Sequence, residues 1–171
     1  MLADGKELLH RGADGLVFGC LKSDGTIDEE RTRRLTELAG DRDSVFHRAI
    51  DVTPDWKQAL DTLIRIGVKR VLTSGQAPSV YFALDTIAEM IRFAGDAIEI
   101  LPGAGINLQN VSRVVEATGT RQIHFSHQRS VPDTSTQYNP DIHFGGALYP
   151  PEDYYGITDG AYFAAMRNKL D

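Results

Sequence analysis

The chain has 171 residues, of which 42% are hydrophobic and 25% charged, as in an ordinary globular protein with a sizeable core. The formal net charge of −6 argues against nucleic acid as the main partner, because it leaves no surplus of cations to neutralise many phosphates. No stretch approaches the roughly 18 apolar residues of a membrane span, and the first residues lack the apolar core of a signal peptide. Cys20 is the only cysteine, so no disulfide can form within the chain and a reducing cytoplasm is the expected location.

Short apolar runs recur at intervals of roughly 25 to 30 residues, each next to a helix-like stretch, which is typical of βα units. These runs lie within 15–21, 43–51, 70–75, 97–105 and 122–126. The expected helices cover about 6–11, 28–39, 55–66 and 107–117. A further helix is expected after 77–79 and ends near 93. Because the runs are almost continuously apolar and end in polar residues, we expect parallel strands covered by helices.

This rhythm predicts an α/β fold of the TIM-barrel type, (β/α)8, incomplete and with about five parallel βα units. Residues 127–158 show no clear period and are expected to form a long irregular segment, followed by a closing helix over 159–170. We expect one domain over 1–171. Its two open edge strands favour association of copies into a homo-oligomer. Four prolines make the irregular segment a poor alternative cover for these edges: Pro132, Pro140, Pro150 and Pro151.

The stretch 43–51 carries the strongest candidates for catalysis. A short apolar run leads into His47, Arg48 and Asp51, and Thr53-Pro54-Asp55 then resembles the start of a helix. Chemistry in α/β proteins is placed where a parallel strand ends before a helix. His47 could transfer a proton, Arg48 could hold an oxyanion, and Asp51 could orient either. The alternative is a structural ion pair between Arg48 and Asp51 beside an interior histidine.

A possible anion site follows the fourth run. Gly103 and Gly105 stand between an expected strand and an expected helix, where backbone N–H groups can approach an anion. The polar residues at the ends of neighbouring runs would lie on the same rim. The expected anion-binding set is Gly103, Gly105, Ser126, Thr73 and Ser74. Glycines also serve tight turns, so both interpretations stay open.

A soft-metal site is a second possibility. The Cys20 sulfur with an imidazole from His47, His124 or His127 would suit Cu(I) or Zn(II), and we take Cys20 and His124 as the expected ligands. No spacing among these residues is a local ligand motif, so the site requires the strands to converge. The alternative for Cys20 is a small buried hydrophobic side chain.

Four successive stretches resemble signatures of the CutC family. They are Gly12-Ala13-Asp14-Gly15-Leu16-Val17-Phe18-Gly19, Phe46-His47-Arg48-Ala49-Ile50-Asp51, Arg70-Val71-Leu72-Thr73-Ser74-Gly75 and Leu101-Pro102-Gly103-Ala104-Gly105-Ile106, with a looser echo in Gly145-Gly146-Ala147. The resemblance implies a cytosolic, homo-oligomeric TIM-barrel protein of copper homeostasis. It also implies that His47, Arg48 and Asp51 lie at the barrel mouth beside Thr73 and Ser74.

The chain departs from the family pattern in three respects. Members of the family carry about three further βα units before the first signature, including an early cysteine proposed to hold copper. Their glycine-rich loop tends to have three consecutive glycines, which Ala104 interrupts in this chain. After the last strand they favour a small residue and Ser-Ala, where this chain has Phe125-Ser126-His127-Gln128.

Three functional hypotheses follow. The first is a copper homeostasis protein of the CutC type that binds Cu(I) or takes part in its handling in the cytoplasm. The second is a lyase or isomerase of a small phosphorylated or acidic substrate. In it Gly103, Gly105 and Arg48 would hold the anion, and His47 with Asp51 would transfer protons. The third is a partial barrel without activity of its own. The expected partner is accordingly a copper ion or a small anionic ligand, with neither nucleic acid nor membrane.

Overall fold

The computed structural model describes residues 1–145 and 152–170, and it divides the chain into two compact units, 1–125 and 126–171. Each unit is described by itself below. Within the described residues, no helix is long and apolar enough to span a bilayer.

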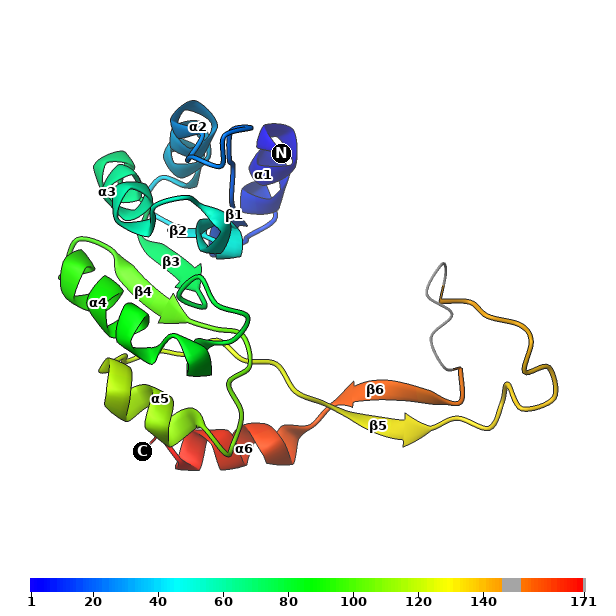
Figure 1. The fold of residues 1–171 in the computed structure, drawn as a ribbon. Coiled ribbons are helices and arrows are strands. Elements are labelled where there is room, and N and C mark those ends of the chain that lie inside the picture. Colours follow the sequence, from blue (N-terminus) through cyan, green and yellow to red (C-terminus); the bar gives the residue numbers. More distant parts are fainter. Residues whose placement is uncertain (146–151, 171) are drawn as a thin grey trace. The chain divides into compact units, whose positions relative to one another are not determined.

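The first unit is built on a parallel sheet (Figure 1). In residues 1–125, all of them described, the sheet has the strand order β1 (Gly15–Phe18), β2 (Asp43–Phe46), β3 (Arg70–Thr73), β4 (Glu99–Pro102). The helices between and around these strands are α1 (Leu2–His10), α2 (Glu29–Ala39), α3 (Trp56–Ile66), α4 (Leu84–Ala94) and α5 (Val111–Thr118). Two short 3-10 helices, η1 (Arg48–Val52) and η2 (Val80–Phe82), lie after β2 and β3. The alternating βα order confirms the expected partial TIM-barrel-like architecture.

One face of the sheet carries the core. Phe18 and Phe46 are paired across β1 and β2 and meet edge to face, with their ring centroids 6.4 Å apart. They pack with side chains of the helices, among them the fully buried Leu60, Leu63 and Met90. Each such side chain contributes about 1.5–3 kcal/mol by its burial. The helix–sheet layer therefore holds this unit together.

The opposite face of the sheet is open at β1, whereas Val45 of β2, which pairs with Val17 on this face, is buried. Val17 lies on this face between the buried Leu16 and Phe18, and 66% of its surface is exposed. Arg70 reaches the carboxylates of Glu99 and Asp43 across neighbouring strands. In a closed barrel such inward residues are packed in layers. This open face is consistent with the expected incompleteness of the barrel.

Helices α2 and α3 each begin directly after an aspartate. The carboxylates of Asp28 and Asp55 accept backbone N–H bonds at the first turns of α2 and α3. Asp55 is thus the N-cap of α3, whereas Thr53 ends the 3-10 helix η1 that precedes it. Gly67 and Gly119 end α3 and α5 in the left-handed conformation that glycine adopts most readily.

The fifth expected strand is reduced to one bridge. His124 pairs in parallel with Gly103, and residues 122–126 form no longer strand. Only Ile123 and Phe125 in this run are apolar, and within this unit no further strand pairs with its other edge. The two helices on either side of β4 also start later than expected. Helix α4 begins at Leu84 because η2 precedes it, and α5 begins at Val111 because a turn closed by hydrogen bonds between Asn107 and Asn110 precedes it.

The second unit contains an antiparallel ribbon and a helix. Strands β5 (Gln128–Pro132) and β6 (Tyr154–Thr158) pair in full register, and α6 (Gly160–Asn168) begins at the Asp159 cap. The expectation of an irregular segment over 127–158 is therefore wrong at both ends. The β-forming pairs Val131 with Tyr155 and Arg129 with Ile157 explain the ribbon. Pro150, Pro151 and the Gly146-Ala147 part of the family echo lie outside the described residues.

Candidate functional site

The carboxyl ends of β2, β3 and β4 meet at one edge of the sheet, and Asp51 is the centre of the hydrogen bonds there. Its carboxylate accepts bonds from Thr73 Oγ1 at 2.5 Å, Ser74 N at 3.0 Å and Ser74 Oγ at 2.8 Å. It also accepts a bond from Gln76 N at 3.2 Å and one from Arg48 Nε at 2.8 Å. The side chain of Asp51 is only 6% exposed. Both carboxylate oxygens are thus fully used in joining η1 to the loop after β3.

These contacts set the ionisation of Asp51. Burial by itself raises its pKa, but the hydrogen bonds from Thr73, Arg48 and Ser74 outweigh burial, so the pKa lies below its ordinary value. The carboxylate is therefore charged at neutral pH and has no free lone-pair direction for a substrate proton. Its geometry suits a positioning role for Arg48 and does not suit the proton transfer considered from the sequence.

Arg48 is held on one side and free on the other. Its Nε donates to Asp51 and its Nη2 donates to Ser74 Oγ at 2.8 Å, which confirms the ion pair that the sequence left as an alternative. The remaining N–H groups on Nη1 and Nη2 have no acceptor among the described residues, and 44% of the side chain is exposed. The structural ion pair and an oxyanion-binding role are thus compatible in one guanidinium.

The imidazole of His47 is fixed by a backbone contact. Its Nδ1 accepts a hydrogen bond from the N–H of Ala49 at 3.1 Å, which caps η1. In the neutral ring the proton therefore lies on Nε2, which becomes a donor. The ring packs against Gly19, where any Cβ would collide with it. A metal could bind Nε2 only if the proton moved to Nδ1, and that move would break the contact with Ala49.

In the loop after β4, carbonyl groups are hydrogen-bonded, whereas several N–H groups have no acceptor among the described residues. The Ala104 carbonyl accepts from Val80 N at 3.1 Å and from Ser79 Oγ at 3.3 Å, and the Gly105 carbonyl accepts from Asn110 Nδ2 at 2.8 Å. Ala104 and Gly105 have positive φ angles of 86° and 77°. The N–H groups of Ala104, Gly105 and Ile106 have no acceptor in the described part of the chain. By contrast, the N–H of Gly103 is used in the sheet, where it donates to Thr73 O.

The two expected copper ligands are not brought together. Cys20 is buried in the core on the helix side, whereas His124 bridges to Gly103 beside the last strand. The strands β1 to β4 separate them, and with about 4.8 Å per strand the distance exceeds roughly 10 Å. Burial, and next the negative charge of Asp28, raise the pKa of the Cys20 thiol, which disfavours the thiolate that Cu(I) requires.

No group of three possible metal ligands forms anywhere in the described residues. The residues present therefore do not fit a copper ion at the expected pair. Ser126, the last residue of the expected anion-binding set, begins the second unit.

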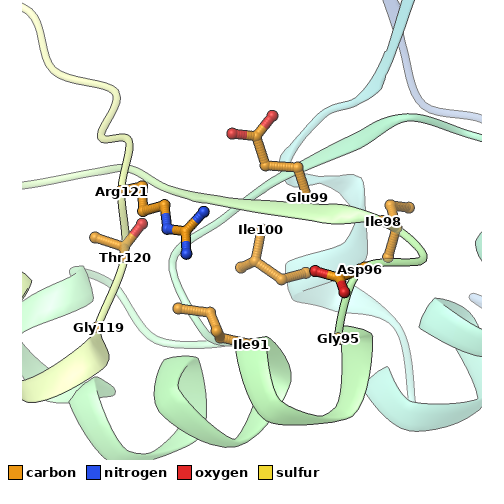
Figure 2. Close-up of a pocket in the computed structure, with 9 residues that line it drawn as sticks. All are labelled: Ile91, Gly95, Asp96, Ile98, Glu99, Ile100, Gly119, Thr120 and Arg121. Atoms are coloured by element: carbon orange, nitrogen blue, oxygen red, sulfur yellow. The ribbon is translucent and has the colours of Figure 1, made fainter.

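A pocket lies at the other end of β4. It has a volume of about 450 Å³ and lies where β4 begins and where α4 and α5 end. Figure 2 shows Arg121 and Asp96 on opposite sides of it, with Ile91 and Ile100 between them. In barrels of this type the amino-terminal end of the strands serves stability and the carboxyl end serves chemistry. The pocket is consequently separate from the candidate site.

Sequence reasoning missed the residues that shape the loop after β4. Ser79 and Asn110 hold its carbonyls, and Gln76 contributes an N–H to Asp51 and its side chain to Thr53 O at 2.6 Å. The pair Asn107 and Asn110 was the available signal, because Asn side chains often bond nearby backbone groups.

Comparison with known proteins places these features in a family. The model of the CutC family matches residues 1–129. A CutC family protein of Treponema denticola is 55% identical over 153 residues, which cover 90% of this chain and 62% of the relative. A copper homeostasis protein cutC homolog of Dictyostelium discoideum is 36% identical, over 91% of this chain and 62% of the relative. The crystal structure of a putative copper homeostasis protein CutC from Streptococcus agalactiae superposes with a TM-score of 0.68 at 30% identity, covering 72% of this chain and 60% of that chain. The chain thus spans about three fifths of the length of these relatives.

Proposed function

The chain belongs to the CutC family, and on that premise we propose that it acts in copper homeostasis in the cytoplasm. The observation that supports this function is the match to relatives of which one is named a copper homeostasis protein. The lone cysteine suits a reducing compartment. The exposed Val17 and the position of β1 at the edge of the sheet in the described part of the chain further support a homo-oligomer.

This role does not require a Cu(I) site made of Cys20 and His124. The buried thiol and the separation of the two residues argue for weak binding at most. If the chain binds copper at all, the soft ligand is Cys20, since no other residue in the chain supplies a thiolate.

Anaerobic titration with Cu(I) against a competing chelator tests the metal. We expect weak binding that Cys20→Ser abolishes and that the matched change His124→Ala leaves unaltered. Stoichiometric, tight binding that survives Cys20→Ser would refute the assignment of Cys20. The copper homeostasis role is tested separately, by the growth of cells lacking their own CutC protein at raised copper concentration. Expression of this chain should restore growth, and no restoration would contradict the proposal.

A second candidate function is that of a lyase or isomerase of a small anionic substrate. The observation that favours it is the Arg48 guanidinium, which Asp51 and Ser74 fix on one side while the other side faces no acceptor among the described residues. In this function Arg48 binds the anion and Asp51 positions Arg48. His47 donates a hydrogen bond from Nε2 to the substrate oxygen that becomes negative when solvent takes up the α-proton.

Deuterium incorporation from ²H₂O into a phosphorylated acid such as 3-phosphoglycerate, followed by NMR, tests the second candidate. His47→Asn is the informative variant, because the Asn side chain can still cap η1 while the imidazole is lost. We expect exchange that this variant abolishes and that His10→Asn, at an exposed position of α1, preserves. Exchange that persists in His47→Asn would remove His47 from the mechanism.

A further inference from the structure

The carboxyl ends of β2, β3 and β4 form one edge of the sheet, called the rim here. In two places on this rim, N–H groups that could bind an anion are left unused by the fold. One is the free side of Arg48, after β2, and the other is the run of N–H groups from Ala104 to Ile106, after β4. Both follow the carboxyl ends of strands in the same parallel sheet, so they lie at the same edge. We propose that this rim binds one small molecule with two anionic groups, a carboxylate on Arg48 and a phosphate on the amides of 104–106. The inference deepens the second candidate function and rests on it.

The shape of the guanidinium favours a carboxylate. Asp51 and Ser74 occupy Nε and one N–H of Nη2. The unused N–H groups of Nη1 and Nη2 are parallel and coplanar, and this fork matches the two oxygens of a carboxylate. Asp51 keeps the fork in place because it also binds Thr73, Ser74 and the N–H of Gln76. Arg48 therefore offers a preorganised bidentate donor.

The loop after β4 favours a phosphate. Three consecutive N–H groups can contact a tetrahedral oxyanion, as in the anion-binding concavities formed by successive backbone amides. The loop is held in this state from outside itself, since Ser79 and Val80 bind the Ala104 carbonyl and Asn110 binds the Gly105 carbonyl. Gly105 has no room for a Cβ, which would collide with Ser79 Oγ. The carbonyls are satisfied while the amides are not, and this asymmetry selects a negative ligand.

The spacing sets the size of the ligand. Arg48 reaches Ser74 at the end of β3, and the amides of 104–106 follow β4, the next strand. Neighbouring strands are about 4.8 Å apart, so the two donor groups are roughly 5 to 10 Å apart. A phosphorylated acid with a chain of three or four carbons fits this interval. A lone phosphate or a lone short carboxylate would fill one end only.

Amide NMR on the ¹⁵N-labelled chain tests the inference with three probes, namely inorganic phosphate, glycerate and 3-phosphoglycerate. We expect phosphate to shift the amide resonances of Ala104, Gly105 and Ile106, and glycerate to shift the side-chain N–H resonances of Arg48. The compound 3-phosphoglycerate should shift both sets and should saturate at a concentration at least tenfold lower than either fragment.

Arg48→Met should weaken the binding of 3-phosphoglycerate by about tenfold and leave that of inorganic phosphate unchanged. Arg48→Lys keeps the charge and guards against a folding defect, and Arg92→Met on α4 is the matched surface control. Phosphate that shifts no resonance of 104–106 would overturn the inference, as would an equal loss of both ligands in Arg48→Met. Binding as expected without any deuterium exchange would instead refute the proposed enzymatic function alone.

Discussion

The removal of the Asp51 carboxylate is the most direct test of how the rim is held together. Asp51→Ala takes the acceptor away from Thr73 Oγ1, from the N–H and hydroxyl of Ser74, from Gln76 N and from Arg48 Nε. These donors join two different loops, so the substitution should release both. Arg48 and Ser74 are placed by this carboxylate, and their geometry should be lost with it.

The expected cost follows from burial and bond number. A net hydrogen bond contributes about 0.5–1.5 kcal/mol, and more when one partner is charged. Arg48 is 44% exposed, so its ion pair adds little, about 0–1 kcal/mol after solvent screening. The Asp51 side chain is only 6% exposed, and its loss leaves Ser74 N and Thr73 Oγ1 short of this partner, while the Ser74 hydroxyl keeps Ala77 O at 2.6 Å. We expect Asp51→Ala to reduce the free energy of unfolding by about 3–5 kcal/mol, as is typical when one partner of a buried charged network is removed.

Urea unfolding monitored by tryptophan fluorescence measures this cost in the first unit. Trp56 is the single tryptophan of the chain and lies in α3, with its ring 5.7 Å from that of Phe93. With an m value of about 1–3 kcal/mol/M, the midpoint should fall by at least about 1 M. Asp61→Ala is the matched control, since Asp61 is 64% exposed and pairs with Arg65 at 3.4 Å, and its effect should stay within about 0.5 kcal/mol. An effect of Asp51→Ala below 1 kcal/mol would refute the reasoning.

Further predictions concern the loops, the pH dependence and the open face. Gly105→Ala should destabilise the first unit by more than about 2 kcal/mol, from strain and collision together, whereas Gly119→Ala has open space and should cost only about 1 kcal/mol; equal costs in urea unfolding would contradict this difference. The folded-state pKa of Asp51 lies below its unfolded value of about 3.9, so its stabilising contribution is present above that pH and is lost as the pH falls through the folded value. The stability difference between wild type and Asp51→Asn should therefore shrink below about pH 4, and a constant difference would exclude this linkage. Val17→Thr should change stability by less than about 0.5 kcal/mol while Phe46→Ala costs about 3–5 kcal/mol, and a large effect of Val17→Thr would show that another surface covers the open face. Light scattering should show association that increases with protein concentration, and a stable monomer would contradict the proposed homo-oligomer.

The sequence predicts the fold of the first unit well, because each of its strands has a local pattern of apolar residues. Runs such as Val71-Leu72 are apolar through their length, and acids such as Asp28 and Asp55 mark the following helices by capping them. Residues 128–132 give no such signal. Gln128, Arg129 and Ser130 read as loop, and they become a strand only through pairing with the distant residues 154–158.

The sequence predicts one interacting pair of the candidate site but not the hydrogen bonds that set its chemistry. The three-residue spacing of Arg48 and Asp51 and their place after a strand indicate an interacting pair, and the structure has this pair. Which ring nitrogen of His47 carries the proton depends on the N–H of Ala49. This N–H lies in a 3-10 turn, which has no periodic sequence pattern. The unused amides of 104–106 depend on Ser79 from another loop, so only tertiary structure exposes them.

The positive φ of Ala104 has a consequence for conformational entropy. An L-residue in this region is strained by about 1–2 kcal/mol, and Ala104→Gly would relieve that strain. The same substitution gives the unfolded chain more freedom, which costs about 0.4–1 kcal/mol, so the net stability changes little. The methyl group of Ala104 instead narrows the set of backbone conformations that the loop can visit in the folded state. With glycine at this position, the amides of 104–106 would sample more conformations before binding. The loop would then lose more conformational entropy when it binds a ligand.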